Sequence, residues 1–264
     1  MSKKIGIVLC GGGVRGLCQI GVLHALEENG ISPGYISGAS IGAIIGLFYA
    51  AGIPPLEILE ISKKSTMIKI ISPTIGKKGF SNLKYLKGLI DKYIPYHRFE
   101  DLKKKLYVAT TNLHQGRLDV FSEGDCLKPV LASASVPLLF EPQEINGEKH
   151  LDAGILNNVP VEPIRQEVDI LISNYVHMHG PIDNPVSLDN WGGVIDRVAT
   201  LSFWEKAARS LEKCNFVIEP REVFSYSAFN KKDDEKLFRL GFEETEKMIP
   251  DIKKAIANQT FEKS

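Results

Sequence analysis

Short apolar runs alternate with helical apolar stripes along the first part of the chain. Lys4 to Leu9 is a brief apolar run that ends at three glycines, as a buried parallel strand does. From Leu17 to Glu28 the apolar residues recur every three or four positions, which predicts a helix that ends before Gly30. Tyr35 to Ser37 then predicts a second strand, and Ile41 to Ala51 predicts a buried helix. This order of elements is typical of an α/β protein with a mostly parallel sheet.

The later part of the chain continues this alternation. Two runs on either side of the turn-prone HQGR predict a hairpin, and two further runs predict core strands: Leu106 to Asn112, Leu118 to Phe121, Asp169 to Ser173 and Asn215 to Glu219. Helical spacing predicts three more helices, at Asn82 to Tyr93, Val194 to Cys214 and Asp233 to Asn258. The stretch from His179 to Gly193 is rich in proline, glycine and asparagine and predicts a long loop.

The uncharged stretch from Asn29 to Leu56 raises the alternative of a membrane helix. Its glycines recur at every fourth position, as on the packing face of a transmembrane helix. However, Pro33, Gly38 and Ser40 would all fall in one half of the span, where they are unfavourable in a helix interior. Glutamates rather than basic residues flank the stretch on both sides. We therefore interpret it as a strand, a tight turn and a buried helix.

Composition narrows the class of protein. Of 264 residues, 44% are hydrophobic and 24% are charged, which is an ordinary globular balance, and the formal net charge of zero gives no indication of nucleic-acid binding. The four cysteines form no CxxC or CxxH pair, so we expect neither a disulfide scaffold nor a zinc site. The apolar run of the opening MSKKIGIVLCGGG is too short for a signal peptide, and we expect a reduced, cytoplasmic protein.

The pentapeptide GASIG places Ser40 between Gly38 and Gly42, at the junction of a predicted strand and a predicted helix. This G-x-S-x-G pattern is typical of a nucleophile elbow, in which a tight turn projects the serine hydroxyl and the glycines avoid steric clashes. The following helix N-terminus would present backbone N–H groups to developing negative charge. The alternative is a serine in a glycine-flanked turn that performs no chemistry.

A second glycine-rich stretch, GGGVRG, lies between the first predicted strand and the first predicted helix. The backbone N–H groups of Gly11, Gly12 and Gly13 can approach an oxyanion or a phosphate without side-chain hindrance. Arg15 adds a positive charge that either holds this loop or meets a phosphate. The loop lacks the patterns of a dinucleotide fingerprint and of a P-loop. Together with an elbow serine, it is better interpreted as an oxyanion hole.

A nucleophilic serine needs a general base, and two kinds of candidate are present. His177 and His179 follow a predicted core strand, which fits the Ser–Asp–His chain order of α/β-hydrolases. The competing candidate is Asp152 in HLDAGILNNVP, where small neighbours would let a carboxylate approach a serine and a dry site would raise its basicity. The alternative for Asp152 is a turn-capping role.

The three stretches GGGVRG, GASIG and DAG, in this order and spacing, resemble the patatin-like phospholipase family. The resemblance covers about two-thirds of the chain and includes ASASVPLLFEP (132–142). It implies a single domain with a three-layer α/β/α fold related to the α/β-hydrolases. From the residue pattern itself, and not from the resemblance, we expect 62–105 to be a cap or lid-like insertion and 194–264 to be a helical C-terminal region. The resemblance also implies a Ser40–Asp152 catalytic dyad without histidine and an oxyanion hole at Gly11, Gly12 and Gly13. The family often has DGG where this chain has DAG, and we expect alanine to have little effect there.

From the resemblance we expect a serine acyl hydrolase that cleaves phospholipid or lysophospholipid esters without a metal or a cofactor. Acyl transfer or thioester hydrolysis could proceed through the same acyl-serine. A protein of another class, a regulatory protein that binds a lipid or a phosphorylated ligand without turnover, is the alternative that covalent labelling of Ser40 would distinguish. The expected partner is a lipid or acyl ester and not nucleic acid.

The segment 62–105 is basic and amphipathic. It carries twelve lysine or arginine residues against three aspartate or glutamate residues, with apolar residues interleaved. Such a segment suits a cap that contacts an anionic membrane surface, and hence peripheral association with the inner face of a membrane. A mobile lid, or a solvated helix-loop-helix with ordinary lysines, would have the same pattern.

Overall fold

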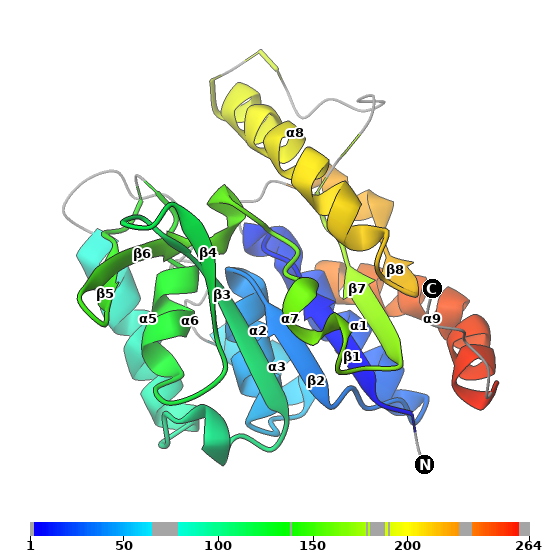
Figure 1. The fold of residues 1–264 in the computed structure, drawn as a ribbon. Helices are drawn as coiled ribbons and strands as arrows, with labels where there is room; N and C mark the ends of the chain where they lie inside the picture. The colour runs from blue at the N-terminus through cyan, green and yellow to red at the C-terminus, as the bar shows by residue number, and fades with distance from the viewer. Residues whose placement is uncertain are drawn as a thin grey trace.

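A computed structural model describes residues 3–64, 79–137, 139–177, 179, 188–189, 191–226 and 234–258 of the chain. Within these residues, eight strands form one sheet in the order β5-β6-β3-β2-β1-β7-β8, and β4 pairs with β3 (Figure 1). The strands are β1 (Ile5–Leu9), β2 (Tyr35–Gly38), β3 (Lys105–Asn112), β4 (Arg117–Phe121), β5 (Gln143–Ile145), β6 (Glu148–Asp152), β7 (Ile170–Asn174) and β8 (Phe216–Ile218).

The centre of the sheet is parallel, as the sequence predicts. Strands β3, β2, β1, β7 and β8 run in the same direction, whereas β4, β5 and β6 add antiparallel pairs at one side. Every residue of β7 is buried, and so are four of the five residues of β1, because helices cover both faces of the sheet here. The four strands that the sequence predicts after residue 100 are β3, β4, β7 and β8, and each lies within a residue or two of its predicted bounds.

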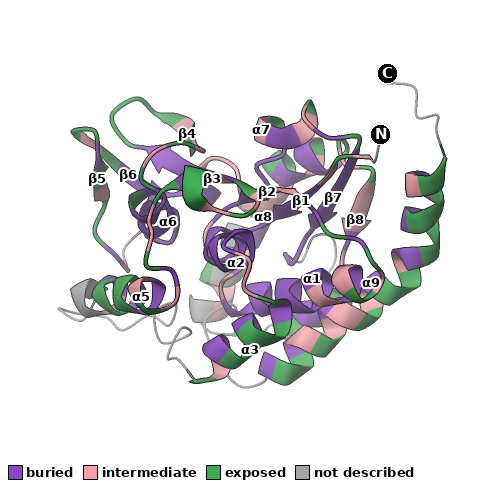
Figure 2. Cartoon of the chain, turned by 90° about the horizontal axis from the view of Figure 1, so that it is seen from below, coloured by how far each residue is buried: buried purple, intermediate pink, exposed green. Residues whose placement is uncertain are grey.

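Helices on both faces of the sheet complete a three-layer α/β/α fold (Figure 2). The α-helices are α1 (Cys18–Glu28), α2 (Ile41–Ala50), α3 (Pro55–Lys64), α5 (Gly79–Tyr93), α6 (Leu127–Ser133), α7 (Glu162–Arg165), α8 (Trp191–Leu211) and α9 (Asp234–Ala257). Short 3-10 turns lie at η1 (Gly13–Leu17), η2 (Phe99–Asp101), η3 (Ala153–Ile155) and η4 (Arg221–Ser225). In Figure 2, α1, α2, α3 and α9 lie below the strands and α7 lies above them.

Several elements were not predicted from the pattern of apolar residues. Helix α3 follows soon after α2 and begins at Pro55, because proline is well suited to the first turn of a helix. Strands β5 and β6 are short and mainly polar, so they carry little of the apolar signal on which strand prediction depends. The predicted loop at 179–193 overlaps the start of α8, and most of its other residues lie outside the described part of the chain.

The membrane-helix alternative finds no support in the fold. In the part of the chain that the structure describes, no helix is long and apolar enough to span a bilayer. The uncharged stretch instead contains β2, a tight turn and α2, which is ten residues long and buried throughout.

Helices α1 and α9 pack closely because each has a glycine at the crossing. A Cβ atom at Gly21 would lie 1.9 Å from the carbonyl oxygen of Phe238, and one at Gly241 would lie 1.9 Å from that of Cys18. These distances are far below van der Waals contact, and the obstacle is backbone in both helices. The two glycines therefore set the distance between α1 and α9.

Gly241→Ala is expected to destabilise the protein by about 1–3 kcal/mol, because the helices must separate to admit a methyl group. The loss should occur although alanine favours a helix by about 1 kcal/mol over glycine. The measurement is the free energy of unfolding in urea. Gly88→Ala on α5, where a Cβ would meet nothing within 4 Å, is the matched control and should be neutral or stabilising. Equal stability of the two variants would contradict the packing argument.

Candidate active site

The register of the sheet brings Ser40 and Asp152 together. Strand β2 pairs with the first half of β3, where Gly38 lies opposite Val108, and β6 pairs with its second half, where Asp152 lies opposite Thr110. Both Val108 and Thr110 also pair with β4, so β2 and β6 occupy the same edge of β3, one after the other. The chain leaving β2 at Gly38 therefore turns at the point where β6 delivers Asp152. Two residues so far apart in sequence become neighbours through β3.

Ser40 lies at the turn between β2 and α2 in a backbone conformation that is rare for residues other than glycine. Its φ of 53° and ψ of −125° are those of a strained turn, as a nucleophile elbow requires. The flanking glycines are needed for space. A Cβ at Gly38 would lie 2.7 Å from the Cα of Ala43, and one at Gly42 would lie 2.0 Å from the carbonyl oxygen of Leu9. Both supporting glycines predicted from the sequence thus make close backbone contacts.

Asp152 ends β6 and caps η3. Its carboxylate accepts a hydrogen bond from the backbone N–H of Gly154 at 2.7 Å, and the Ser40 side chain interacts with it. The residue is only 6% exposed, and burial raises the pKa of the carboxyl to about 6, although Ser40 and the Gly154 N–H both act to lower it. A carboxylate with this pKa is ionised at neutral pH and still basic enough to exchange a proton.

Two serines near the end of α6 hold the backbones of both residues. The N–H of Ser40 donates to Oγ of Ser133 at 2.8 Å, and the N–H of Asp152 donates to the carbonyl of Ser135 at 3.0 Å. The Ser135 hydroxyl in turn donates to the Leu131 carbonyl. The sequence analysis did not assign these positioning roles. Their signal is the run of small residues ASAS within 132–142, which lets the end of α6 approach two strands closely.

The glycine loop lies directly beside Ser40. A Cβ at Gly11 would lie 3.1 Å from the Cβ of Ser40 and 2.1 Å from the side-chain oxygen of Asn158. Asn158 holds this residue through two further contacts, since its carbonyl accepts the Gly11 N–H at 3.3 Å and its side-chain amide donates to the Gly11 carbonyl at 3.2 Å. Of the three predicted oxyanion donors, Gly11 already has an acceptor for its N–H.

The other two glycines differ from Gly11. Among the described residues, the backbone N–H groups of Gly12 and Gly13 donate to no acceptor. Gly13 adopts a φ of 56°, and a Cβ at Gly12 would lie 2.3 Å from the side chain of Val176, so the loop conformation depends on glycine at both positions. The N–H of Ile41, the residue after Ser40, likewise has no acceptor in the described chain. This is the position that supplies one oxyanion donor in nucleophile elbows.

Arg15 is buried, which favours the first of its two predicted roles, that of holding the loop. It is 1% exposed, and its Nε donates to the carbonyl of Tyr226 at 2.6 Å. The guanidinium therefore joins the glycine loop to the C-terminal part of the fold, and its geometry is that of a residue that holds the loop. Its charge also contributes to the lowered pKa of His177.

The two histidines considered as triad members have other partners. Nε2 of His177 contacts the Gly11 carbonyl at 2.8 Å and the side-chain amide of Asn158, and burial lowers the pKa of this imidazole to about 4. His179 pairs with Glu219 at 2.6 Å and stacks on Trp204 with ring centroids 3.7 Å apart. Neither histidine hydrogen-bonds to Ser40 or Asp152 in the described structure. His177 thus belongs to the support of the glycine loop.

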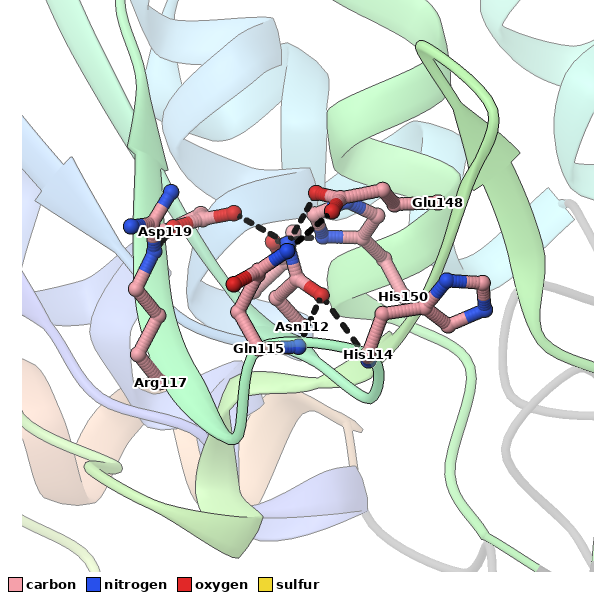
Figure 3. Close-up of polar contacts among 8 residues, drawn as sticks. Asn112, His114, Gln115, Arg117, Asp119, Glu148 and His150 are labelled. Atoms are coloured by element: carbon pink, nitrogen blue, oxygen red, sulfur yellow. Dashed lines mark hydrogen bonds and ion pairs between the residues drawn. The ribbon is translucent and has the colours of Figure 1, made fainter.

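A group of potential metal ligands lies on β4 and β6, and β6 is the strand that ends at Asp152 (Figure 3). Ligand atoms of Asp119, Glu148 and His150 lie within 4.8 Å of one another, and Nδ1 of His150 contacts the Thr110 hydroxyl at 2.9 Å. These are residue types that could hold a divalent cation.

Protein donors already occupy the carboxylates of this group. Asn112 donates to both Asp119 and Glu148, and Arg117 and Gln115 donate to their remaining oxygens. The network joins the β3–β4 hairpin to β6, as Figure 3 shows. We interpret it as a structural network that holds the strand carrying Asp152.

Known sequences match the part of the chain that contains this candidate site. A family model described as patatin-like phospholipase matches residues 7–165, a range that contains Ser40, Asp152 and the glycine loop. The chain is 31% identical over 192 residues to the lysophospholipase NTE1 of Pyricularia oryzae, covering 70% of this chain and 13% of that protein. It is 28% identical over 219 residues to an uncharacterized NTE family protein of Mycobacterium tuberculosis, covering 80% of this chain and 60% of that protein. The chain thus spans about an eighth of the fungal relative and a little over half of the mycobacterial one.

Solved structures show the same fold at low sequence identity. VipD from Legionella pneumophila superposes with a TM-score of 0.57 and 15% identity, covering 95% of this chain and 67% of that chain. Human GIVD cytosolic phospholipase A2 superposes with a TM-score of 0.52 and 13% identity, covering 97% of this chain and 59% of that chain. These likenesses concern the arrangement of the sheet and helices.

Proposed function

Since this chain belongs to the patatin-like phospholipase family, a family of ester-hydrolysing enzymes, we propose that it is a serine acyl hydrolase that cleaves phospholipid or lysophospholipid acyl esters. The observation that carries the proposal is the contact between Ser40 and Asp152. A serine at a strained strand-to-helix turn interacts through its side chain with a buried carboxylate whose pKa is raised to about 6. This is the arrangement of a nucleophile and a base.

In the proposed reaction, Ser40 Oγ attacks the ester carbonyl while the Asp152 carboxylate takes the hydroxyl proton. The tetrahedral intermediate collapses to an acyl-serine, and the proton passes from Asp152 to the leaving alcohol. Water then attacks the acyl-serine, with Asp152 acting as base again, and the fatty acid leaves. The hydrogen bond from Gly154 N–H keeps the carboxylate oriented toward Ser40 throughout.

We assign oxyanion stabilisation to the backbone N–H groups of Gly12 and Gly13, with Gly11 forming the wall beside Ser40. The assignment is supported by the absence of an acceptor for the first two in the described structure. Removing one such donor typically costs about 3–4 kcal/mol of transition-state stabilisation. The glycine loop is held in place by Arg15, Asn158 and His177.

The test is a panel of p-nitrophenyl esters of graded acyl length beside a panel of lysophospholipids, together with labelling by a fluorophosphonate. Hydrolysis with stoichiometric labelling at Ser40 is expected. If Ser40 is labelled but turnover requires an added alcohol or thiol acceptor, the protein is an acyltransferase. If it cleaves acyl thioesters and no oxygen ester, it is a thioesterase. A protein that is inert to the probe and binds a lipid or phosphorylated ligand would be the non-catalytic alternative.

The pH dependence of turnover should follow the ionisation of Asp152. Because the carboxylate form is the base, kcat/KM for a p-nitrophenyl ester should rise as pH increases through about 6 and reach a plateau above pH 7. The measurement is a pH–rate profile between pH 4.5 and 8.5, limited to the range in which circular dichroism is unchanged. A profile that is already flat from about pH 5 upward, as the pKa near 4 of an exposed aspartate would give, would contradict a buried base.

We also propose peripheral contact of the basic segment 62–105 with an anionic membrane surface, and hence a cytoplasmic protein at the inner face of a membrane. In the described part of this segment, Lys63 pairs with Glu60 and Glu235, and Lys64 pairs with Glu60, so part of its charge is compensated within the protein. The apolar and basic residues at 65–78 lie outside the described residues.

A further inference from the structure

An apolar ridge runs along the first half of α8. It consists of Trp191, Ile195, Val198 and Leu201, whose side chains are 81%, 62%, 58% and 48% exposed. At 100° per residue, the first three lie in line along one side of the helix, with Leu201 beside them. Single exposed apolar side chains are common on protein surfaces, whereas exposed apolar side chains that gather in one patch are typical of interaction sites.

The ridge lies on the outward face of α8 and not on its packing face. The packing face is the opposite side, where Thr200, Ala207 and Leu211 are buried. The line through the ridge continues into polar residues in the second half of the helix, Ser202, Glu205 and Arg209. A surface helix ordinarily has polar residues along its whole outward face. Here the apolar part is confined to the half that projects away from the sheet (Figure 1).

Helix α8 also contacts the candidate active site, further along its length and on a different side from the ridge. The ring of Phe203, just beyond the ridge, lies 3.7 Å from the position of a Cβ at Gly154, which itself contacts the Asp152 carboxylate. Lys206 donates to the carbonyl of Ile155 at 2.9 Å, and Ile155 is an exposed apolar residue of the same turn. The helix that carries the ridge therefore also packs against the turn that carries the proposed base.

We propose that this ridge inserts into the surface of a zwitterionic phospholipid aggregate and places the active site at the lipid boundary. The choice of lipid rests on the proposed function, because the helix that carries the ridge also packs against the site that would take a lipid ester. Tryptophan with aliphatic neighbours is the composition of interfacial anchors. A second copy of this chain is a poorer candidate for the partner of the ridge. A stable protein interface needs about 800 Å² and 20–30 residues a side, whereas the ridge consists of four side chains. The ridge side chains are uncharged, so this contact differs from that proposed for 62–105.

The experiment measures vesicle binding without turnover. The full chain carrying Ser40→Ala is mixed with phosphatidylcholine vesicles, and binding is followed by flotation and by tryptophan fluorescence in a Trp204→Phe background, where Trp191 is the remaining tryptophan. We expect a blue shift on binding, and the added pair Trp191→Ala and Ile195→Ala to lower the partition coefficient about 10- to 100-fold in the flotation assay. Leu56→Ala on α3, a 49% exposed leucine, is the matched control and should bind normally. Binding should change little between 50 and 500 mM salt.

Several outcomes would overturn the proposal. The first is that the protein does not bind phosphatidylcholine vesicles. The second is that the ridge variant binds them as strongly as the parent protein. The third is that the protein binds only anionic vesicles at low salt, which would favour the segment 62–105 as the membrane contact. Self-association that the ridge substitutions abolish, measured by sedimentation without lipid, would assign the ridge to a second copy. The ridge variant with Ser40 intact should hydrolyse a monomeric p-nitrophenyl ester normally and a vesicular lipid more slowly. If the parent protein binds vesicles but hydrolyses no ester, the proposed function fails while the ridge proposal stands.

Discussion

Ser40→Ala is expected to lower kcat for ester hydrolysis by at least about 10⁴-fold and to abolish labelling by a fluorophosphonate. The substitution removes the atom that would form the acyl intermediate, and what remains is catalysis by the oxyanion donors and binding alone. Steady-state kinetics on a p-nitrophenyl ester and intact-mass measurement after labelling check both effects. Fold integrity is followed by thermal unfolding, which should change little or improve, because alanine at this strained turn keeps the same backbone.

The matched control for Ser40→Ala is Ser81→Ala, a serine on α5 remote in sequence from the candidate site. It should label and turn over normally. Stoichiometric labelling that persists in Ser40→Ala would place the nucleophile elsewhere and contradict the proposed function. If Ser40 and Asp152 act as a unit, adding Asp152→Asn to Ser40→Ala should cause little further loss of kcat.

Asp152→Asn is expected to lower kcat by about 10³- to 10⁴-fold with the fold intact. An asparagine can still accept the hydrogen bond from Gly154 N–H, but it cannot take the proton from the Ser40 hydroxyl. His179→Gln is the matched control, because His179 pairs with Glu219 and should leave turnover nearly unchanged. Near-normal turnover in Asp152→Asn, together with a large loss in His177→Gln or His179→Gln, would favour a histidine triad and contradict the dyad.

The same variant should be more stable than the parent protein at alkaline pH. Burial raises the folded-state pKa of Asp152 to about 6, above its ordinary value of 3.8, so the folded protein favours the protonated carboxyl. The contribution of Asp152 to stability is therefore full below about pH 4 and is lost as pH rises through about 6. By pH 8 the buried charge costs about 3 kcal/mol, which asparagine avoids. In urea unfolding, the free energy of unfolding of Asp152→Asn should exceed that of the parent protein at pH 8, and the difference should be smaller at pH 4.

The sequence was sufficient for the parts of this protein that depend on local pattern. Apolar periodicity predicted β1, α1, β2 and α2 within a residue or so, because a buried parallel strand and its following helix carry continuous apolar signals. The pentapeptide around Ser40 predicted a tight turn, because the flanking glycines of G-x-S-x-G are required by backbone space that the structure confirms. The fold class and the family followed from these elements and from the order of three short motifs.

Only the tertiary structure decided which groups meet. The contact of Ser40 with Asp152 arises because β2 and β6 share one edge of β3, a non-local register that no local pattern encodes. The same holds for Arg15, whose burial against Tyr226 is set by the packing of a distant segment. It also holds for the outward face of α8, since helical spacing marks apolar positions but not which of them find a partner. Local conformation follows from short-range sterics and apolar periodicity, whereas contacts between distant segments depend on strand register and packing, which take shape only when the whole chain folds.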